Sequence, residues 1–206
     1  MMFDILCLLS LLAVILNLKR LVNIFPSLIA CIIRWKESLN LEASVKLSRD
    51  RDIIAFTMTV PFCLTAVRFS LYDPAFFSGM KENAGIWMTL LIFTIYCLFR
   101  LSVTKIFHFG RIKRDVMRTA IKVSNTFFII LTLVLLATGG TMAFLDVEEN
   151  TIRLAMLWIS VCIYTVHLLR KLQIFNSSCS VFTAFLYLCA LEIIPTGTLV
   201  VSALIF

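Results

Sequence analysis

Long apolar runs separated by short polar segments dominate the pattern of this chain. A run of about 18 or more apolar residues is long enough to cross the hydrocarbon core of a bilayer as a helix. The pattern predicts membrane-spanning helices at residues 1–18, 53–72, 86–107, 123–145, 152–169 and 180–204. These runs lack the strict polar-apolar alternation of outer-membrane strands, so we expect an all-α, polytopic helical membrane protein with about six transmembrane helices.

Residues 24–39 form a shorter apolar segment of a different kind. Six large apolar side chains recur there at helical spacing, opposite Ser27, Arg34 and Lys36. The segment is too short to span and is flanked by basic residues, so the pattern predicts an N-terminal amphipathic helix in the membrane interface. A curved continuation of the first span is the alternative. Pro26 suits the first turn of such a helix, and the polar residues 40–52 predict a solvated loop.

Composition supports membrane insertion and a single domain. The chain has 206 residues, is 61% hydrophobic and 15% charged, and has a mean hydropathy of +0.99. Soluble domains are about half apolar and a quarter charged. No repeat or low-complexity linker divides residues 1–206, so we expect one domain. The seven cysteines include no C-x-x-C and are typical of small buried hydrophobic residues rather than of a disulfide or zinc framework.

The net charge of +7 is distributed unevenly along the chain. Basic residues concentrate in 19–51, 105–122 and 170–171, whereas 73–83 and 146–153 are mainly acidic. The positive-inside rule then predicts cytoplasmic basic loops and periplasmic termini. Asp4 precedes the first run and basic residues follow it, which is the reverse of a secretory signal, so we expect a retained anchor.

The last apolar run carries the most unusual chemistry, a carboxylate followed by a proline. Glu192 lies near the middle of the run, where an unpaired charge costs several kcal/mol. Pro195 has no N–H, so the carbonyl of Leu191 is expected to lose its helical partner. Both groups need partners from other helices, which predicts that this turn faces the interior of the bundle.

Polar stripes at helical spacing on the other spans supply candidate partners. They include Arg68 on 53–72, Tyr96 and Arg100 on 86–107, and Ser160, Tyr164, His167 and Lys171 on and just after 152–169. The predicted buried polar cluster contains Glu192, Arg100, Arg68, Pro195, Tyr96, Tyr164 and His167. Helical rise puts both arginines within about 7 Å of the membrane centre, and the lean of side chains toward the helix N-terminus favours a Glu192–Arg100 pair over Arg68. A structural ion pair and a proton relay or substrate cavity both remain open.

Two further segments contain patterns that are typical of functional sites. The basic segment 105–122 suits anionic lipid headgroups or a cytoplasmic partner, although a loop that only sets topology explains it more simply, and nucleic acid is disfavoured. Residues 148–153 fit E-E-x-x-x-R, which resembles the first motif of CAAX-type intramembrane proteases. His108 and His167 do not complete that enzyme's histidine motifs or a metal-binding spacing. We therefore expect no catalytic residues, metal or cofactor.

Residues 185–195, FLYLCALEIIP, resemble the C-terminal signature of an uncharacterised Bacteroidota family, domain of unknown function 4271. The resemblance implies a multi-span protein of the bacterial inner membrane and brings no activity. With short loops and no complete catalytic motif, we expect a non-enzymatic subunit or assembly factor of an inner-membrane complex, in contact with other membrane subunits. A small transporter or proton-coupled protein working through Glu192 is the alternative.

Overall fold

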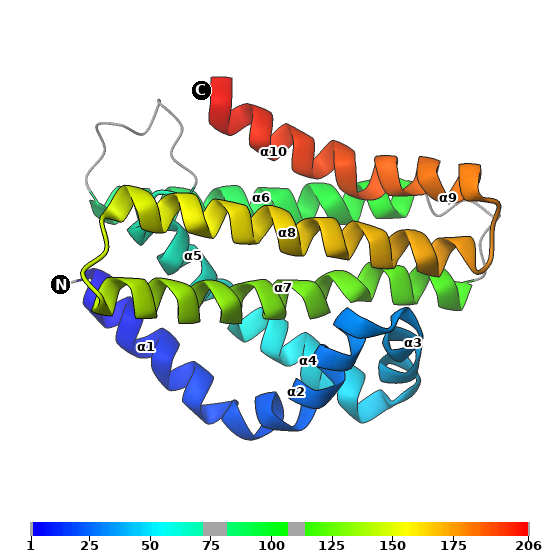
Figure 1. Ribbon diagram of the computed structural model, residues 1–206, viewed down its shortest axis with the longest axis horizontal. Coiled ribbons are helices and arrows are strands. Elements are labelled where there is room, and N and C mark those ends of the chain that lie inside the picture. The colour runs from blue at the N-terminus through cyan, green and yellow to red at the C-terminus, as the bar shows by residue number, and fades with distance from the viewer. Residues whose placement is uncertain (1, 72–81, 107–113, 206) are drawn as a thin grey trace.

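The structure, a computed structural model, describes residues 2–71, 82–106 and 114–205. Within these ranges all regular structure is helical and no strand occurs, which confirms the predicted all-α class (Figure 1). Four helical segments in the described ranges are long and apolar enough to cross a membrane: Ala84–Thr104, Val116–Phe144, Glu149–Asn176 and Val181–Val201. A fifth arises if the first two helices, bent by 71°, are counted as one broken span. The expected count of about six is therefore only partly matched.

The four long segments form the main bundle. They belong to α6 (Glu82–Ile106), α7 (Arg114–Phe144), α8 (Glu149–Asn176), and α9 (Val181–Leu188) with α10 (Ile194–Ile205). These helices correspond to the last four predicted spans. However, α7 begins inside the predicted basic loop, and a π-helical turn separates α9 from α10. Ser180 caps α9 by accepting a hydrogen bond from the Thr183 N–H.

The N-terminal part is more broken than the hydrophobic pattern predicted. Its helices are α1 (Met2–Leu16), α2 (Leu18–Ile33), α3 (Trp35–Ala43), α4 (Val45–Thr57) and α5 (Thr59–Arg68). The predicted interfacial helix 24–39 had the wrong bounds, because α2 begins earlier and stops at Arg34, whose backbone is extended. Pro26 consequently lies inside α2, and the buried face consists of Ile24, Leu28 and Cys31, whereas Phe25 is exposed.

Two other expectations for this part were wrong. Residues 40–52 are not a solvated loop but helical, interrupted only at Ser44. The predicted span 53–72 does not exist as one helix, because α4 ends at Thr57 and α5 starts at Thr59. Pro61 lies in the first turn of α5, where its missing N–H is tolerated, and this position favours the start of a new helix. Residues 72–81, expected to hold the end of that span, lie outside the described ranges.

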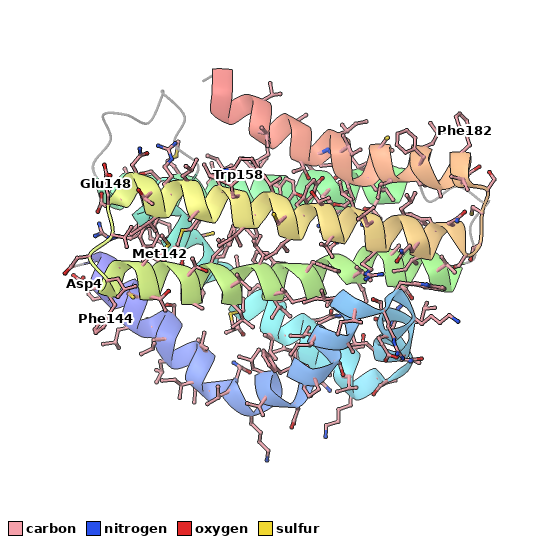
Figure 2. The ribbon with its side chains drawn as sticks, in the orientation of Figure 1. Asp4, Met142, Phe144, Glu148, Trp158 and Phe182 are labelled. Carbon is pink, nitrogen blue, oxygen red and sulfur yellow. The ribbon has the colours of Figure 1, made fainter. Side chains whose placement is uncertain are left out.

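Helix α7 lies at the centre of the molecule. One apolar cluster joins it to α8 and α9 through residues such as Phe127, Phe175 and Ala184. A second cluster joins it to α2 and α4 through Ile24, Ile54 and neighbouring side chains. Large apolar residues also cover the outward faces, among them Phe144, Trp158 and Phe182 (Figure 2). An exposed apolar surface of this extent suits contact with lipid or with other membrane proteins.

The helix ends separate into two groups along the long axis of the bundle. Figure 1 shows the start of α7, the end of α8 and the start of α9 at one end, with α3 nearby. The start of α8, the end of α7 and the start of α1 lie at the other end. The first group carries Arg118, Lys122 and Arg170, so we call it the basic end. The opposite group carries Asp146, Glu148 and Glu149 and is the acidic end.

Candidate functional site

The π-helical turn Cys189–Ile193 positions Glu192 inside the bundle. At its end the N–H of Ile194 donates to the Cys189 carbonyl, five residues back instead of four. The wider register comes immediately before Pro195, whose missing N–H removes the ordinary helical partner of the Leu191 carbonyl. Tyr164 on α8 donates its hydroxyl to the backbone carbonyl of Glu192 at 3.3 Å. Turns of this kind are frequent at functional sites.

The Glu192 carboxylate is 2% exposed and is surrounded by basic side chains. Its Oε1 accepts hydrogen bonds from Arg100 Nη2 at 2.5 Å and from Lys171 Nζ. Its Oε2 lies 3.5 Å from His167 Nε2. The Ser124 hydroxyl on α7 contacts both Arg100 and Lys171. Glu192, Arg100, Lys171, His167 and Ser124 therefore form one group, the Glu192 cluster, that joins α6, α7, α8 and the π turn.

The structure brings together most of the residues that the sequence placed here. Arg100 is the arginine that contacts Glu192, as the lean of side chains toward the helix N-terminus favoured. Tyr96 lies at the edge of the cluster, where its hydroxyl is 3.3 Å from Thr196 Oγ1, one residue after the buried Pro195. Together with Tyr164 and His167, these residues line the same interior region, which was expected from their helical spacing.

Arg68 does not join the cluster, so its inclusion was wrong. It is the last residue of α5, and its exposed side chain lies 3.5 Å from the exposed Glu149 at the acidic end. The separate, short α5 places Arg68 at a helix end, where its long side chain reaches a surface carboxylate. An exposed pair of this type contributes about 0–1 kcal/mol.

The predicted set omitted two residues of the cluster, Ser124 and the charged Lys171. The sequence assigned Lys171 to the basic residues behind a span ending at 169, but α8 continues to Asn176 and Lys171 is 1% exposed. The signal was present, because Lys171 follows Tyr164 and His167 on the same helical stripe. Lysine stems can also reach from a helix end into the interior, which blurs the boundary between span and loop.

The charges of the Glu192 cluster do not cancel. One carboxylate, Glu192, faces two basic side chains, Arg100 and Lys171, and the Nδ1 atom of the buried His167 has no hydrogen-bond partner among the described residues. A buried charge is tolerated only when it is paired and hydrogen-bonded, so Glu192 is needed by both cations at once. Chemically, the arrangement can hold four helical segments together. It also offers a buried imidazole beside a carboxylate.

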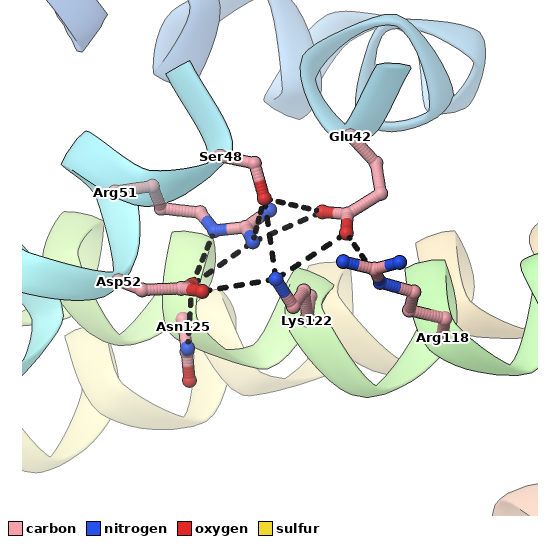
Figure 3. Close-up of polar contacts among 7 residues, drawn as sticks. All are labelled: Glu42, Ser48, Arg51, Asp52, Arg118, Lys122 and Asn125. Carbon is pink, nitrogen blue, oxygen red and sulfur yellow. Dashed lines mark hydrogen bonds and ion pairs between the residues drawn. The ribbon is translucent and has the colours of Figure 1, made fainter. Parts of the chain in front are cut away.

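A second polar group, which the sequence did not predict, lies at the basic end (Figure 3). This Arg51 cluster consists of Glu42, Ser48, Arg51, Asp52, Arg118, Lys122 and Asn125. Arg51 is 1% exposed and donates to Glu42 Oε2, Asp52 Oδ1 and Ser48 Oγ at 3.0, 2.9 and 3.1 Å. Lys122 and Asn125 of α7 donate to Asp52 at 3.0 and 3.1 Å. The cluster therefore ties α3 and α4 to α7.

The electrostatics of Asp52 reflect this network. Partial burial opposes its ionisation, but hydrogen bonds from Lys122 and Asn125 and the charge of Arg51 outweigh that effect, so the pKa of Asp52 is lowered. The cluster was not predicted from the sequence because residues 40–52 are polar, and a polar segment is expected to lie in water rather than pack against another helix. The only local signal was the helical spacing of Ser48, Arg51 and Asp52.

The remaining candidates from the sequence have ordinary positions or fall outside the described ranges. Arg118 and Lys122, in the predicted basic segment, contact Glu42, while His108 and the other residues of 107–113 are not described. Glu148 and Glu149 begin α8. Among the described residues no group of three or more His, Cys, Asp or Glu side chains could hold a metal. No protein-family model, curated protein or solved structure matches this chain.

Proposed function

We propose that this chain is a multi-pass inner-membrane protein that serves as a non-enzymatic subunit or assembly factor of a membrane complex. The observation that carries the proposal is that the Glu192 carboxylate is already bound by three side chains of the same protein, Arg100, Lys171 and His167. A carboxylate engaged in this way stabilises the fold rather than serving a substrate. The wide apolar surface of the bundle then offers contact area for neighbouring subunits.

The proposed orientation places the basic end in the cytoplasm and both chain termini in the periplasm. The basic end carries Arg118, Lys122 and Arg170, and the positive-inside rule assigns such an end to the cytoplasm. In this arrangement the chain crosses six times, and the first two crossings use the broken pairs α1–α2 and α4–α5. The resemblance of residues 185–195 to the Bacteroidota family supports the inner membrane as the location.

Complex formation is tested by solubilising membranes in a mild detergent and comparing the full chain with a Glu192→Gln variant. We expect the wild-type chain to migrate on native gels with a fixed set of subunits that mass spectrometry identifies. The variant should accumulate less and lose those subunits in proportion. A wild-type chain that migrates alone, at the size of one copy in detergent, contradicts the proposal.

Topology is tested with single cysteines in a background without the seven native ones. A cysteine replacing Glu148, at the acidic end, should react with an impermeant maleimide in intact spheroplasts. A cysteine replacing the exposed Asn176, at the basic end, should react only after lysis. Reversed labelling of the two positions refutes the orientation.

A proton-coupled transporter is the second candidate, and His167 is the observation that favours it. Its imidazole is buried beside Glu192, and no described residue forms a hydrogen bond with its Nδ1. The two functions predict different behaviour of a His167→Gln variant, because this side chain can keep a hydrogen bond but cannot carry a proton. A relay predicts normal accumulation with loss of proton flux into proteoliposomes containing a pH-sensitive dye. A subunit predicts no such flux even in the wild-type chain.

A further inference from the structure

An open pocket of about 570 Å³ lies beside the Arg51 cluster at the basic end. Residues of α3, α4 and the first turns of α7 line it, and three of them are the cations Arg49, Arg118 and Lys122. Glu42 and Asp52 are the carboxylates in the lining. With the adjoining Arg51, four cations face two carboxylates, so the site keeps a positive charge.

Two of these cations are available to a ligand. Lys122 is occupied by Ser48 and Asp52, and Arg51 is buried against both carboxylates. Among the described residues Arg118 contacts a charged side chain only at Glu42, through Nε at 3.1 Å, and its side chain is 65% exposed. Its two terminal nitrogens therefore remain for the forked contact that guanidinium makes with phosphate. Arg49 is exposed and contacts no other charged side chain in the described ranges.

The same pocket has an apolar wall that a small soluble anion does not need. Val45 and Phe56 of α4 line it and are 83% and 84% exposed. Ile53, three residues before Phe56, lies on the same side of the helix. Cations beside exposed apolar side chains match a ligand with an anionic head and a hydrocarbon tail. The pocket also adjoins α7 where its apolar stretch begins at Val116.

We propose that this pocket binds the phosphate headgroup of an anionic phospholipid, with its acyl chain along Val45, Ile53 and Phe56. Arg118 and Arg49 hold the phosphate, while the Arg51 cluster fixes the positions of α4 and α7. The inference does not rest on the proposed function, because a subunit and a transporter would carry the site equally well. It also locates lipid binding between helices α4 and α7 rather than in a loop.

The test uses the purified full chain in a neutral detergent, titrated with phosphatidylglycerol or with phosphatidylethanolamine. Binding is read from the rise in unfolding temperature and from bound lipid in native mass spectra. We expect phosphatidylglycerol to be preferred. Each basic residue near a lipid surface contributes about fivefold in affinity, so Arg49→Gln should weaken binding by about fivefold and the Arg49→Gln/Arg118→Gln variant by roughly 25-fold.

Matched variants distinguish a specific lipid site from a general electrostatic attraction between the basic protein and anionic lipid. Lys19→Gln/Lys36→Gln removes two exposed cations outside the pocket and should leave the affinity unchanged. Equal weakening by both double variants overturns the proposal. If the loss of Arg118 affects folding, Arg49→Gln still tests the site, because Arg49 makes no hydrogen bond or ion pair with another described residue that the substitution would break.

A soluble anion is the rival ligand, and inorganic phosphate and glycerol 3-phosphate are its probes. We expect neither to stabilise the chain at concentrations at which phosphatidylglycerol saturates it. Phe56→Ser should weaken phosphatidylglycerol binding, because it removes apolar contact from a side chain that is already exposed. Stabilisation by phosphate alone that equals the lipid effect, together with a silent Phe56→Ser variant, refutes a lipid site.

Discussion

Neutralising Glu192 should destabilise the fold more than neutralising either of its cations. In the wild-type chain Arg100 and Lys171 share this one carboxylate, so Glu192→Gln leaves the buried Lys171 and the partly buried Arg100 without a counter-charge. Breaking a buried pair by removing one partner costs roughly 3–5 kcal/mol. At about 1.4 kcal/mol for each factor of ten, the folding equilibrium should shift by roughly two to four orders of magnitude.

Lys171→Met has a different expected result, because it removes the surplus cation and leaves a matched Arg100–Glu192 pair. The loss is then about one charged hydrogen bond, roughly 1.5–3 kcal/mol, reduced by the relief of repulsion from Arg100. In the Glu192→Gln/Lys171→Met double variant only one cation stays stranded. The double variant should therefore be clearly more stable than the sum of the two single effects predicts.

The free energy of unfolding in mixed micelles, measured by titration with a denaturing detergent, checks this order. Glu149→Gln is the control, since Glu149 is an exposed carboxylate near Arg68 and its loss should cost less than about 1 kcal/mol. The charge argument is refuted if Lys171→Met costs as much as Glu192→Gln. It is also refuted if the double variant equals the sum of the single variants.

Three further predictions use the same measurement. Because the pKa of Asp52 is lowered, its stabilisation of the fold is present above about pH 4 and is lost as the pH falls through its pKa in the folded state. Asp52→Asn should therefore have a lower free energy of unfolding than the wild-type chain at neutral pH, and this difference should become smaller in acid. A difference that does not change with pH contradicts this prediction. Arg170 donates hydrogen bonds of 2.7–3.0 Å to the last two carbonyls of α2, so Arg170→Gln should lower the free energy of unfolding by about 1–2 kcal/mol. An unchanged free energy would mean that water satisfies these carbonyls equally well. Gly139→Ala should cost about 1–3 kcal/mol because the new methyl meets Met156, whereas Gly140→Ala enters open space and should be neutral or slightly stabilising; equal effects contradict the packing.

The Glu192 cluster was largely predictable because its chemistry depends on local periodicity. Tyr164, His167 and Lys171 recur on one helical face, and the depth of Arg100 follows from the rise per residue. The errors at Arg68 and Lys171 share a cause, which is the placement of helix ends. The pattern extended one helix through Met58 and stopped another at 169, so Arg68 was placed inside the bundle and Lys171 outside it.

The Arg51 cluster could not be predicted in the same way, because its partners come from distant parts of the chain. Lys122 lies 70 positions from Asp52, and a polar stretch such as 40–52 is equally compatible with water and with a matching set of charges. Only the docking of α4 against α7 decided between the two. The end of the basic segment was expected to be a loop, whereas Arg118 and Lys122 lie in α7 and contact Glu42 and Asp52.

The sequence by itself determined the all-helical class, the long apolar helices, the uneven charge and the need of Glu192 for partners. These features depend on side-chain periodicity and on the cost of burying an unpaired charge, which act within one helix. Tertiary structure alone decided the bend after α1, the break at Met58, the π turn, and the contact of Glu192 with Arg100, 92 positions away. A local pattern states what each helix must bury, but only packing selects which other helix supplies the matching charge.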